Sequence, residues 1–223
     1  MSRREDAKAE RRHRIVTAAR DLIRETGDTG LSMRAIAARA GVSLSTPYNL
    51  FGSKRAIVLA VLEDIEEFHT RFARMKSLDA IERIFQALAL SIRFYVEDPD
   101  FYRTLWTGVF DMSGKEVRQA LARPERGAFW LSLINAAAAE GAIAPAIDTA
   151  LLMRNLDFAF GAVMLNWVLG ALTTDELAPA AAHAYALALG GAATPAWRER
   201  LAARVAAAQE QLLKLHRRPA DAA

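Results

Sequence analysis

One stretch near the N-terminus, residues 32–54, reads SMRAIAARAGVSLSTPYNLFGSK. Its first half favours a short helix over residues 33–40, because Ser32 suits an N-cap and apolar residues recur at helical spacing. A second short helix is expected over residues 44–51. Gly41 between them suits a tight turn, because glycine reaches positive φ without Cβ strain. Two short helices joined by such a turn predict a helix-turn-helix.

The second short helix has two faces. Ser43 can cap it, and three nonpolar residues can turn back into a small core: Val42, Pro47 and Phe51. The remaining side chains then point outward: Leu44, Ser45, Thr46, Tyr48, Asn49 and Leu50. Two exposed leucines, a tyrosine and an asparagine on so short a helix are unusual as plain surface. We therefore interpret it as a helix that enters the major groove of double-stranded DNA.

The outward side chains match the chemistry of base edges and phosphates. Asn49 can pair bidentately with an adenine edge, and Leu44 can touch a thymine methyl. The hydroxyl groups of Ser45 and Thr46 can bond bases or phosphates. Phosphate oxygens, which set register rather than sequence, suit two further residues: Tyr48 and Lys54.

The charge distribution supports a polyanion as partner. The chain has a net charge of +3, but residues 1–60 hold twelve Lys and Arg against six Asp and Glu, so the remainder is mildly acidic. A basic front end is typical of nucleic-acid binding, although a solvated helical surface carries the same charges. Five cations at the start can reach the minor groove or phosphates, or can belong to a disordered solubilising arm: Arg3, Arg4, Lys8, Arg11 and Arg12.

The whole chain is predicted to be all-α, because it lacks strand-like alternation and is rich in Ala, Leu and Arg. Helices are expected over Asp6–Thr26, from Ser53 through Phe68, and over Leu78–Glu97, Asp100–Phe110, Lys115–Glu140, Asp148–Leu172, Asp175–Leu189 and Ala196–Arg217. Pro124 should kink or split its helix. We expect a helix-turn-helix domain over residues 1–56 and a larger helical domain over residues 57–223, joined inside the helix that starts at Ser53.

Composition excludes several classes of protein. The chain has no cysteine, which excludes disulfides, thiolate zinc sites and cysteine nucleophiles. The charged N-terminus has no apolar segment of the secretory kind, and the longest apolar run, residues 158–172, is too short to span a bilayer, so a cytoplasmic protein without a membrane partner is expected. The sequence contains no P-loop and no metalloprotease motif, and its four histidines are scattered, so no enzyme, cofactor or metal is predicted.

The segment around the turn resembles the TetR/AcrR family of one-component repressors. The matching residues are Ile36-Ala37, Ala40-Gly41-Val42-Ser43, Thr46, Tyr48, Phe51 and Ser53-Lys54. Departures are Pro47 where an aliphatic residue is common, Leu50 where an aromatic residue or His is common, and Gly52 where proline is frequent. The close match covers about residues 10–60. Together with the outward face, it implies DNA contacts by Ser32, Arg34, Ser43, Leu44, Ser45, Thr46, Tyr48, Asn49 and Lys54.

For the larger domain, the resemblance implies a ligand cavity in the middle helices and a dimer formed by two late helices. The aromatic residues expected at the cavity are Trp106, Phe110, Phe129, Trp130, Phe158 and Trp167, and the ligand is expected to be small and apolar or aromatic. The dimer helices are expected at about residues 148–190, although intrachain burial would suit them equally. The last helix can extend the dimer or fold back on its own subunit.

These expectations describe a repressor that a small molecule releases from a palindromic operator. An activator would share the same DNA chemistry. The alternative from another class is a helical small-molecule carrier with a degenerate DNA-binding head, a reading that the departure at Leu50 and the exposed Leu44 keep open.

Overall fold

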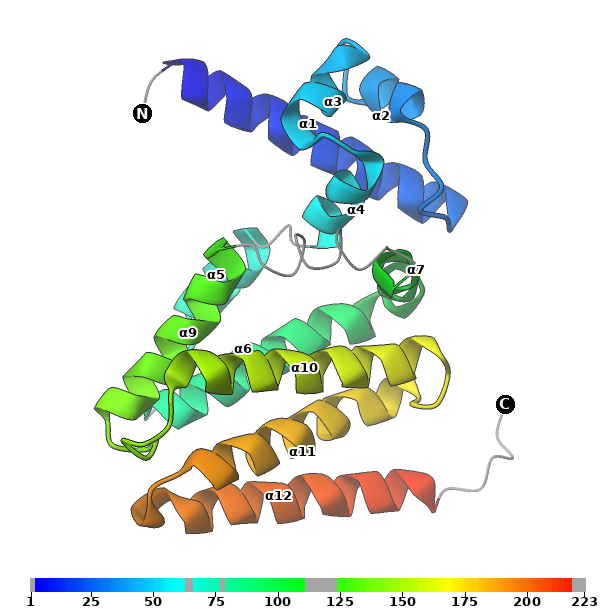
Figure 1. The fold of residues 1–223 in the computed structure, drawn as a ribbon. Helices are drawn as coiled ribbons and strands as arrows, with labels where there is room; N and C mark the ends of the chain where they lie inside the picture. Colours follow the sequence, from blue (N-terminus) through cyan, green and yellow to red (C-terminus); the bar gives the residue numbers. More distant parts are fainter. Residues whose placement is uncertain (1–2, 63–65, 77–78, 111–123, 218–223) are drawn as a thin grey trace. The chain divides into compact units, whose positions relative to one another are not determined.

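The computed structural model describes residues 3–62, 66–76, 79–110 and 124–217. These residues are helical apart from turns and one isolated β-bridge between Ile143 and Ala193, which confirms the all-α prediction (Figure 1). The chain divides into two compact units. Unit 1 comprises Met1–Glu67 and Asp98–Ala122, and unit 2 comprises Phe68–Glu97 and Arg123–Ala223.

Unit 1 is built around the first long helix. It contains α1 (Arg3–Thr26), α2 (Met33–Arg39), α3 (Ser45–Phe51), α4 (Lys54–Leu62) and α7 (Pro99–Phe110). Helix α1 packs against α2, α3 and α4, and α4 packs against α7. The core is aliphatic and includes the fully buried side chains of Ile15, Ile36, Ile57 and Leu105. Burial of such side chains is the main force that holds the short helices in place.

Local signals fix the ends of these helices. Gly27, with φ of +62°, ends α1, and Gly41, with φ of +64°, makes the turn after α2. The Ser32 hydroxyl accepts a hydrogen bond from the Ala35 amide at 3.0 Å, so the predicted N-cap of α2 is confirmed. Ser53 caps α4 in the same way, through the Ala56 amide at 3.2 Å.

The predicted cap of α3 is wrong. Leu44 occupies the N-cap position, and no side chain caps α3 there. Ser43 Oγ instead lies 3.0 Å from Ser45 Oγ and 2.8 Å from Thr46 Oγ1, within hydrogen-bonding distance of both hydroxyls. Nearby hydroxyl groups have therefore replaced the backbone amide as the partner of Ser43.

Helix α7 joins unit 1 although it is distant in sequence. The Arg24 guanidinium on α1 donates to the Asp98 carboxylate just before α7, at 3.1 Å, and stacks 4.6 Å above the Phe101 ring. Leu105 lies in the core of the same unit. The compact units therefore do not divide at residue 56, where the sequence analysis set the boundary.

Unit 2 is a bundle in which α11 is central. It contains α6 (Ala80–Glu97), α9 (Pro124–Ala139), α10 (Thr149–Val168), α11 (Thr174–Ala192), α12 (Pro195–His216) and most of α5 (Glu66–Ala73). Helix α11 packs against α6, α10 and α12, and the last three helices lie side by side (Figure 1). Residues 63–65 and 111–123, where the expected helices from Ser53 and from Lys115 continue, lie outside the described residues.

The last helix folds back on its own subunit. Leu201 of α12 is fully buried, and Arg200 forms an ion pair with Asp79 at 2.7 Å beside the start of α6. A second ion pair joins Arg204 to Glu82. Of the two arrangements that the sequence left open for this helix, the structure describes intrachain packing.

Candidate nucleic-acid interface

The predicted helix-turn-helix is present at residues 33–51. The turn after α2 is held by backbone hydrogen bonds from the Gly41 amide to the Ala38 carbonyl at 3.2 Å and from the Val42 amide to the Ala37 carbonyl at 3.0 Å. On α3, Pro47 is buried and Phe51 is half-buried against the core. The inner face of α3 is therefore the one that the sequence predicted.

The outer face of α3 is exposed. Leu44 and Tyr48 are 46% and 51% exposed, Ser45 and Asn49 are exposed, and Thr46 is half-buried. Leu50 was expected to point outward as well, but it is half-buried against the core, because position 50 is three residues after Pro47 and so lies on nearly the same side of the helix. The outward face therefore does not include Leu50, one of the three residues that depart from the family pattern.

The remaining predicted DNA contacts lie at helix starts of the same unit. Ser32 is exposed, although its hydroxyl caps α2, and Arg34 is exposed in the first turn of that helix. Ser43 is exposed in the turn before α3, and Lys54 is half-buried as the first residue of α4. The structure therefore keeps all nine predicted DNA-contact residues at least partly accessible on one compact unit.

One ion pair that the sequence analysis did not identify positions α2. The Arg39 guanidinium at the end of α2 donates to both carboxylate oxygens of Glu25 on α1, at 2.8 and 2.9 Å. The hydrogen bonds from Arg39 lower the pKa of the Glu25 carboxyl. Because Glu25 balances its charge, Arg39 is a poorer candidate for phosphate contact than Arg34.

The six aromatic residues predicted to line a ligand cavity do not form one cluster. Trp106 and Phe110 stack on α7 in unit 1, with ring centroids 5.5 Å apart. Phe129 and Trp130 lie on α9 in unit 2. Phe158 on α10 is 68% exposed, whereas Trp167 is fully buried and donates its ring N–H to Thr174 Oγ1 at 3.2 Å.

Phe129 and Trp130 belong to an aromatic cluster of unit 2. The Phe129 ring makes edge contacts with Phe68 and Phe72 on α5, at 5.4 and 5.2 Å between centroids. Trp130 contacts Phe129 at 5.6 Å and Tyr185 of α11 at 6.2 Å. Both α9 rings are half-buried, so they remain accessible within a largely apolar surrounding.

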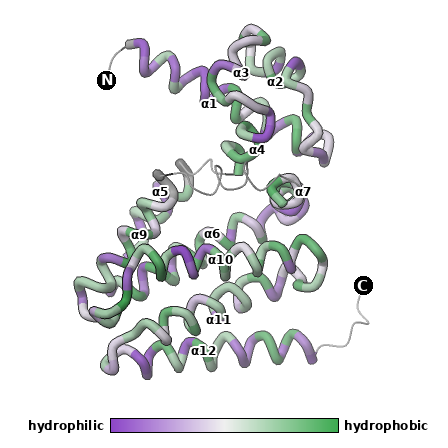
Figure 2. The backbone as a smooth tube through the Cα atoms, viewed as in Figure 1, coloured by the Kyte–Doolittle hydropathy of each residue, from purple (hydrophilic) through white to green (hydrophobic). Residues whose placement is uncertain are grey.

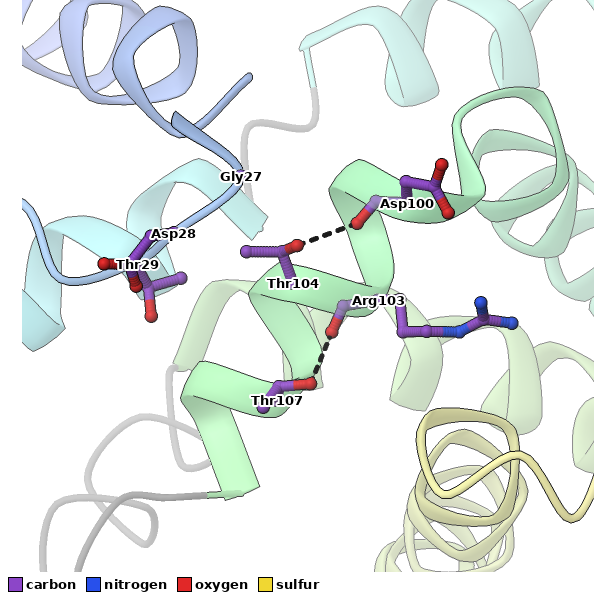
Figure 3. A pocket seen from close by; sticks show the side chains of 7 residues that line it. All are labelled: Gly27, Asp28, Thr29, Asp100, Arg103, Thr104 and Thr107. Carbon is purple, nitrogen blue, oxygen red and sulfur yellow. Dashed lines mark hydrogen bonds between the residues drawn. The ribbon is translucent and has the colours of Figure 1, made fainter. Parts of the chain in front are cut away.

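Unit 1 contains a polar hollow that the sequence did not predict. It has a volume of about 390 Å³, between the turn after α1 and helix α7 (Figure 3). Its lining consists of Gly27, Asp28, Thr29, Asp100, Arg103, Thr104 and Thr107. Thr104 and Thr107 already donate to backbone carbonyls of α7, both at 2.9 Å. This lining differs in chemistry from the apolar cavity that was expected.

Exposed apolar side chains gather along α10. Leu151, Phe158 and Leu165 recur every seven residues, and Leu169 follows one turn later. Leu151 and Leu169 are 60% and 71% exposed. A heptad repeat of exposed apolar residues is typical of a helix that packs against another helix.

Among the described residues, no group of three or more His, Asp or Glu side chains is placed to hold a metal ion. Within the same ranges, none of the helices is long and apolar enough to cross a membrane.

Comparison with known proteins relates the helix-turn-helix region to one family. Residues 15–61 match the model of a family described as bacterial regulatory proteins, tetR family. No curated protein sequence matches the chain.

Solved structures resemble the chain over most of its length. TylP, a TetR regulator from Streptomyces fradiae, is 20% identical with a TM-score of 0.61, over 92% of this chain and 98% of that one. FadR of Thermus thermophilus, a TetR-family repressor in complex with lauroyl-CoA, is 19% identical with a TM-score of 0.64, over 81% and 94%. RolR in complex with resorcinol is 21% identical with a TM-score of 0.62, over 96% and 97%. The likeness at these identities is one of fold.

Proposed function

We propose that this chain, whose residues 15–61 match the model of the tetR family of bacterial regulatory proteins, is a transcription regulator of that family that binds an operator and responds to a small molecule. The observation that carries the proposal is the outer face of α3. A leucine, a tyrosine, a serine and an asparagine stand exposed on a short helix whose inner face is anchored in the core. A helix of that kind fits the major groove.

Each part of the proposed DNA surface has its own task. Asn49 reads an adenine edge, and Leu44 contacts a thymine methyl. The hydroxyls of Ser43, Ser45 and Thr46 form a small polar cluster that serves bases or phosphates. Phosphate oxygens are held by the residues at helix starts and by the exposed phenol: Ser32, Arg34, Lys54 and Tyr48.

The regulator is proposed to act as a homodimer through α10. The expected dimer segment, about residues 148–190, includes α11, but α11 packs on three sides within its own unit, where Leu177 and Leu189 are fully buried. The exposed heptad on α10, centred on Phe158, is the better seam for a second copy. A two-fold dimer would place two copies of α3 on a pseudo-palindromic site.

The proposed ligand is small and apolar or aromatic, and its site includes Phe129 and Trp130. Support comes from the half-buried rings of these two residues, which pack against buried aromatic rings of α5 and α11. Two structurally similar regulators were solved with lauroyl-CoA, which carries an aliphatic acyl chain, and with resorcinol, which is aromatic. Trp106 and Phe110 are proposed to act from α7, the helix that packs on α4.

Release from DNA would follow by population shift. The ligand binds more tightly to an arrangement of the dimer whose two α3 helices do not fit successive major grooves. Ligand binding then lowers DNA affinity by the difference between the ligand's affinities for the two arrangements. We propose a repressor of this kind, acting in the cytoplasm where its operator is.

The test is selection of bound duplexes from a random pool at physiological salt. The proposal predicts enrichment of a palindrome whose half-sites lie about one helical turn apart or somewhat more. Retention of DNA without any enriched sequence, or no retention, would instead favour a helical carrier whose DNA-binding head is degenerate.

A further inference from the structure

Helix α1 extends well beyond the core of its unit. It begins at Arg3, but its first buried side chain is Ile15. The described side chains from Arg4 to Arg14 are exposed, apart from the half-buried Arg12. Figure 2 shows this N-terminal half of α1 as largely hydrophilic. About three helical turns therefore project without packing in the core.

Three basic residues of this projection follow one helix face, and Arg12 and Arg14 lie to either side of it. One face of α1 is marked by residues spaced alternately four and three apart, at positions 4, 8, 11, 15, 18 and 22. The first three are Arg4, Lys8 and Arg11, and the last three are Ile15, Ala18 and Leu22. The face of α1 that packs in the core thus continues outward as a basic stripe, which we define as Arg4, Lys8 and Arg11.

The acidic residues of the projection are Glu5, Asp6 and Glu10. Asp6 and Glu10 are four residues apart and share a face of their own: at about 100° per residue, Asp6 lies on the far side of α1 from Lys8 and Arg4, and Glu10 lies well away from both. Glu5, three residues before Lys8, lies beside the stripe. The stripe therefore holds three cations with one carboxylate at its edge, and it keeps a net positive charge that can meet a polyanion.

Arg12, next to the stripe, connects the inner end of the projection to α3. Arg12 donates to the Leu50 carbonyl oxygen at 3.4 Å, and its guanidinium stacks 4.2 Å above the Phe51 ring. Both partners belong to the last turn of α3. The basic stripe consequently starts beside the end of the helix whose outer face is proposed to read bases.

We propose that the basic stripe binds DNA backbone phosphates beside the bases that α3 reads. The proposal rests on the proposed function and adds a second contact surface to it. The stripe acts as a rigid helical element, so its cations are ordered before binding. It contributes affinity and register but no base preference, because phosphates carry no sequence information.

The experiment measures the dependence of DNA affinity on salt. The triple variant Arg4→Gln, Lys8→Gln, Arg11→Gln is compared with wild type on the duplex selected from the random pool. Each lost phosphate contact flattens the slope of log K against log salt concentration by about 0.9, and a dimer on the palindrome carries two stripes, so we expect a change of up to about 5.4. The sequence selected by the variant should stay the same. An unchanged slope would overturn the proposal.

Two controls separate the stripe from bulk charge and from a flexible arm. Arg198→Gln, Lys214→Gln, Arg217→Gln removes the same charge from α12 and its C-cap and should leave the slope unchanged; an equal flattening would refute a local contact. Ala9→Pro keeps every cation but breaks the helix, and it should lose the contribution of Arg4 and Lys8 in both subunits, up to about 3.6 in slope. A full wild-type slope in that variant would refute the rigid element.

Failure of the proposed function gives a different pattern. If wild type binds DNA without sequence preference while the stripe variant still loses slope, operator recognition is wrong and the stripe is a general phosphate contact. If wild type selects a palindrome and the stripe variant keeps its slope, operator recognition stands and the stripe is wrong.

Discussion

Thr29, in the turn that precedes α2, lies directly against Gly108 of α7. A Cβ atom at Gly108 would be 3.0 Å from Thr29 Oγ1 and 3.1 Å from Thr29 Cγ2. A side chain at position 108 would make these contacts tighter than most Cβ atoms make, so Thr29 would have to shift by a few tenths of an ångström. Because that turn leads into Ser32, the cap of α2, we expect a displacement of α7 to change the position of the helix-turn-helix.

Gly108→Val should therefore force the turn away from α7. Overpacking of this kind costs on the order of 1–3 kcal/mol, which a thermal melt would detect as a lower Tm. The same variant should weaken operator binding, because the start of α2 moves with the turn.

Thr29→Ala in the same chain should recover part of that loss, because it removes the two nearest atoms. The double-mutant cycle is expected to give a coupling of roughly 0.5–3 kcal/mol. Additive effects of the two substitutions would show that the contact does not join the turn to α7.

Glu176 at the start of α11 should make the stability of the protein sensitive to acid. Its carboxylate accepts hydrogen bonds from the Thr173 amide at 2.7 Å and the Thr173 hydroxyl at 2.9 Å, and lies 2.8 Å from His216 Nε2. The backbone hydrogen bond from Thr173 is the main cause of a lowered Glu176 pKa. A lowered pKa means that the stabilisation is complete above the ordinary value of 4.5 and is lost as pH falls through the folded-state pKa.

Glu176→Gln should accordingly flatten the fall of Tm below about pH 4.5, since Gln cannot titrate. Glu199→Gln on the exposed surface of α12 is the matched control and should retain the wild-type profile. Identical acid profiles for wild type and Glu176→Gln would show that Glu176 is not the acid-sensitive group.

Phe158 tests the proposed dimer seam. Phe158→Glu places a charge at the centre of the exposed α10 heptad, next to its copy across a two-fold axis, and should convert a dimer into monomers in sedimentation velocity. Leu213→Glu on α12 is the control, because Leu213 is also an exposed apolar residue but lies outside the heptad. Dissociation by the control, or none by Phe158→Glu, would place the interface elsewhere.

Leu201 tests whether α12 belongs to the core of its own subunit. Leu201→Ala removes a fully buried side chain and should cost roughly 2–5 kcal/mol in the free energy of unfolding. Because the contact is within one chain, the loss in Tm should not depend on protein concentration. A loss that disappears at high concentration would instead indicate that α12 packs between subunits.

Local features of unit 1 were predictable from the sequence because they depend on neighbouring residues. The cap at Ser32, the turn at Gly41 and the inner face of α3 follow from spacing and residue type alone. The errors at Ser43 and Leu50 are also local. The Ser43 hydroxyl had competing hydrogen-bond partners in Ser45 and Thr46. The inner face of α3 was assigned from four-residue spacing alone, so Leu50, three residues after Pro47, was wrongly placed on the outer face.

Tertiary features could not be predicted in this way. The association of α7 with α1 depends on Arg24 meeting Phe101 and Asp98, which are more than seventy positions away in the chain. The aromatic residues show the same limit, because Phe158 and Trp167 stand on one helix with equal hydrophobic character in the sequence, yet one is exposed and the other fully buried. Tertiary packing separates them, because Trp167 contacts Tyr95 of α6 and Thr174 of α11.

The measurement that tests the central claim most directly is the ratio of specific to non-specific DNA affinity, for wild type and Asn49→Ala, at physiological salt. The outer face of α3 predicts a wild-type ratio of roughly 10³ or more for a selected palindrome over random duplex. Asn49→Ala should reduce specific affinity by about 1–3 kcal/mol and relax the preference at one base pair per half-site, with non-specific affinity nearly unchanged. A wild-type ratio near one, or a variant that discriminates as well as wild type, would contradict base reading by this helix.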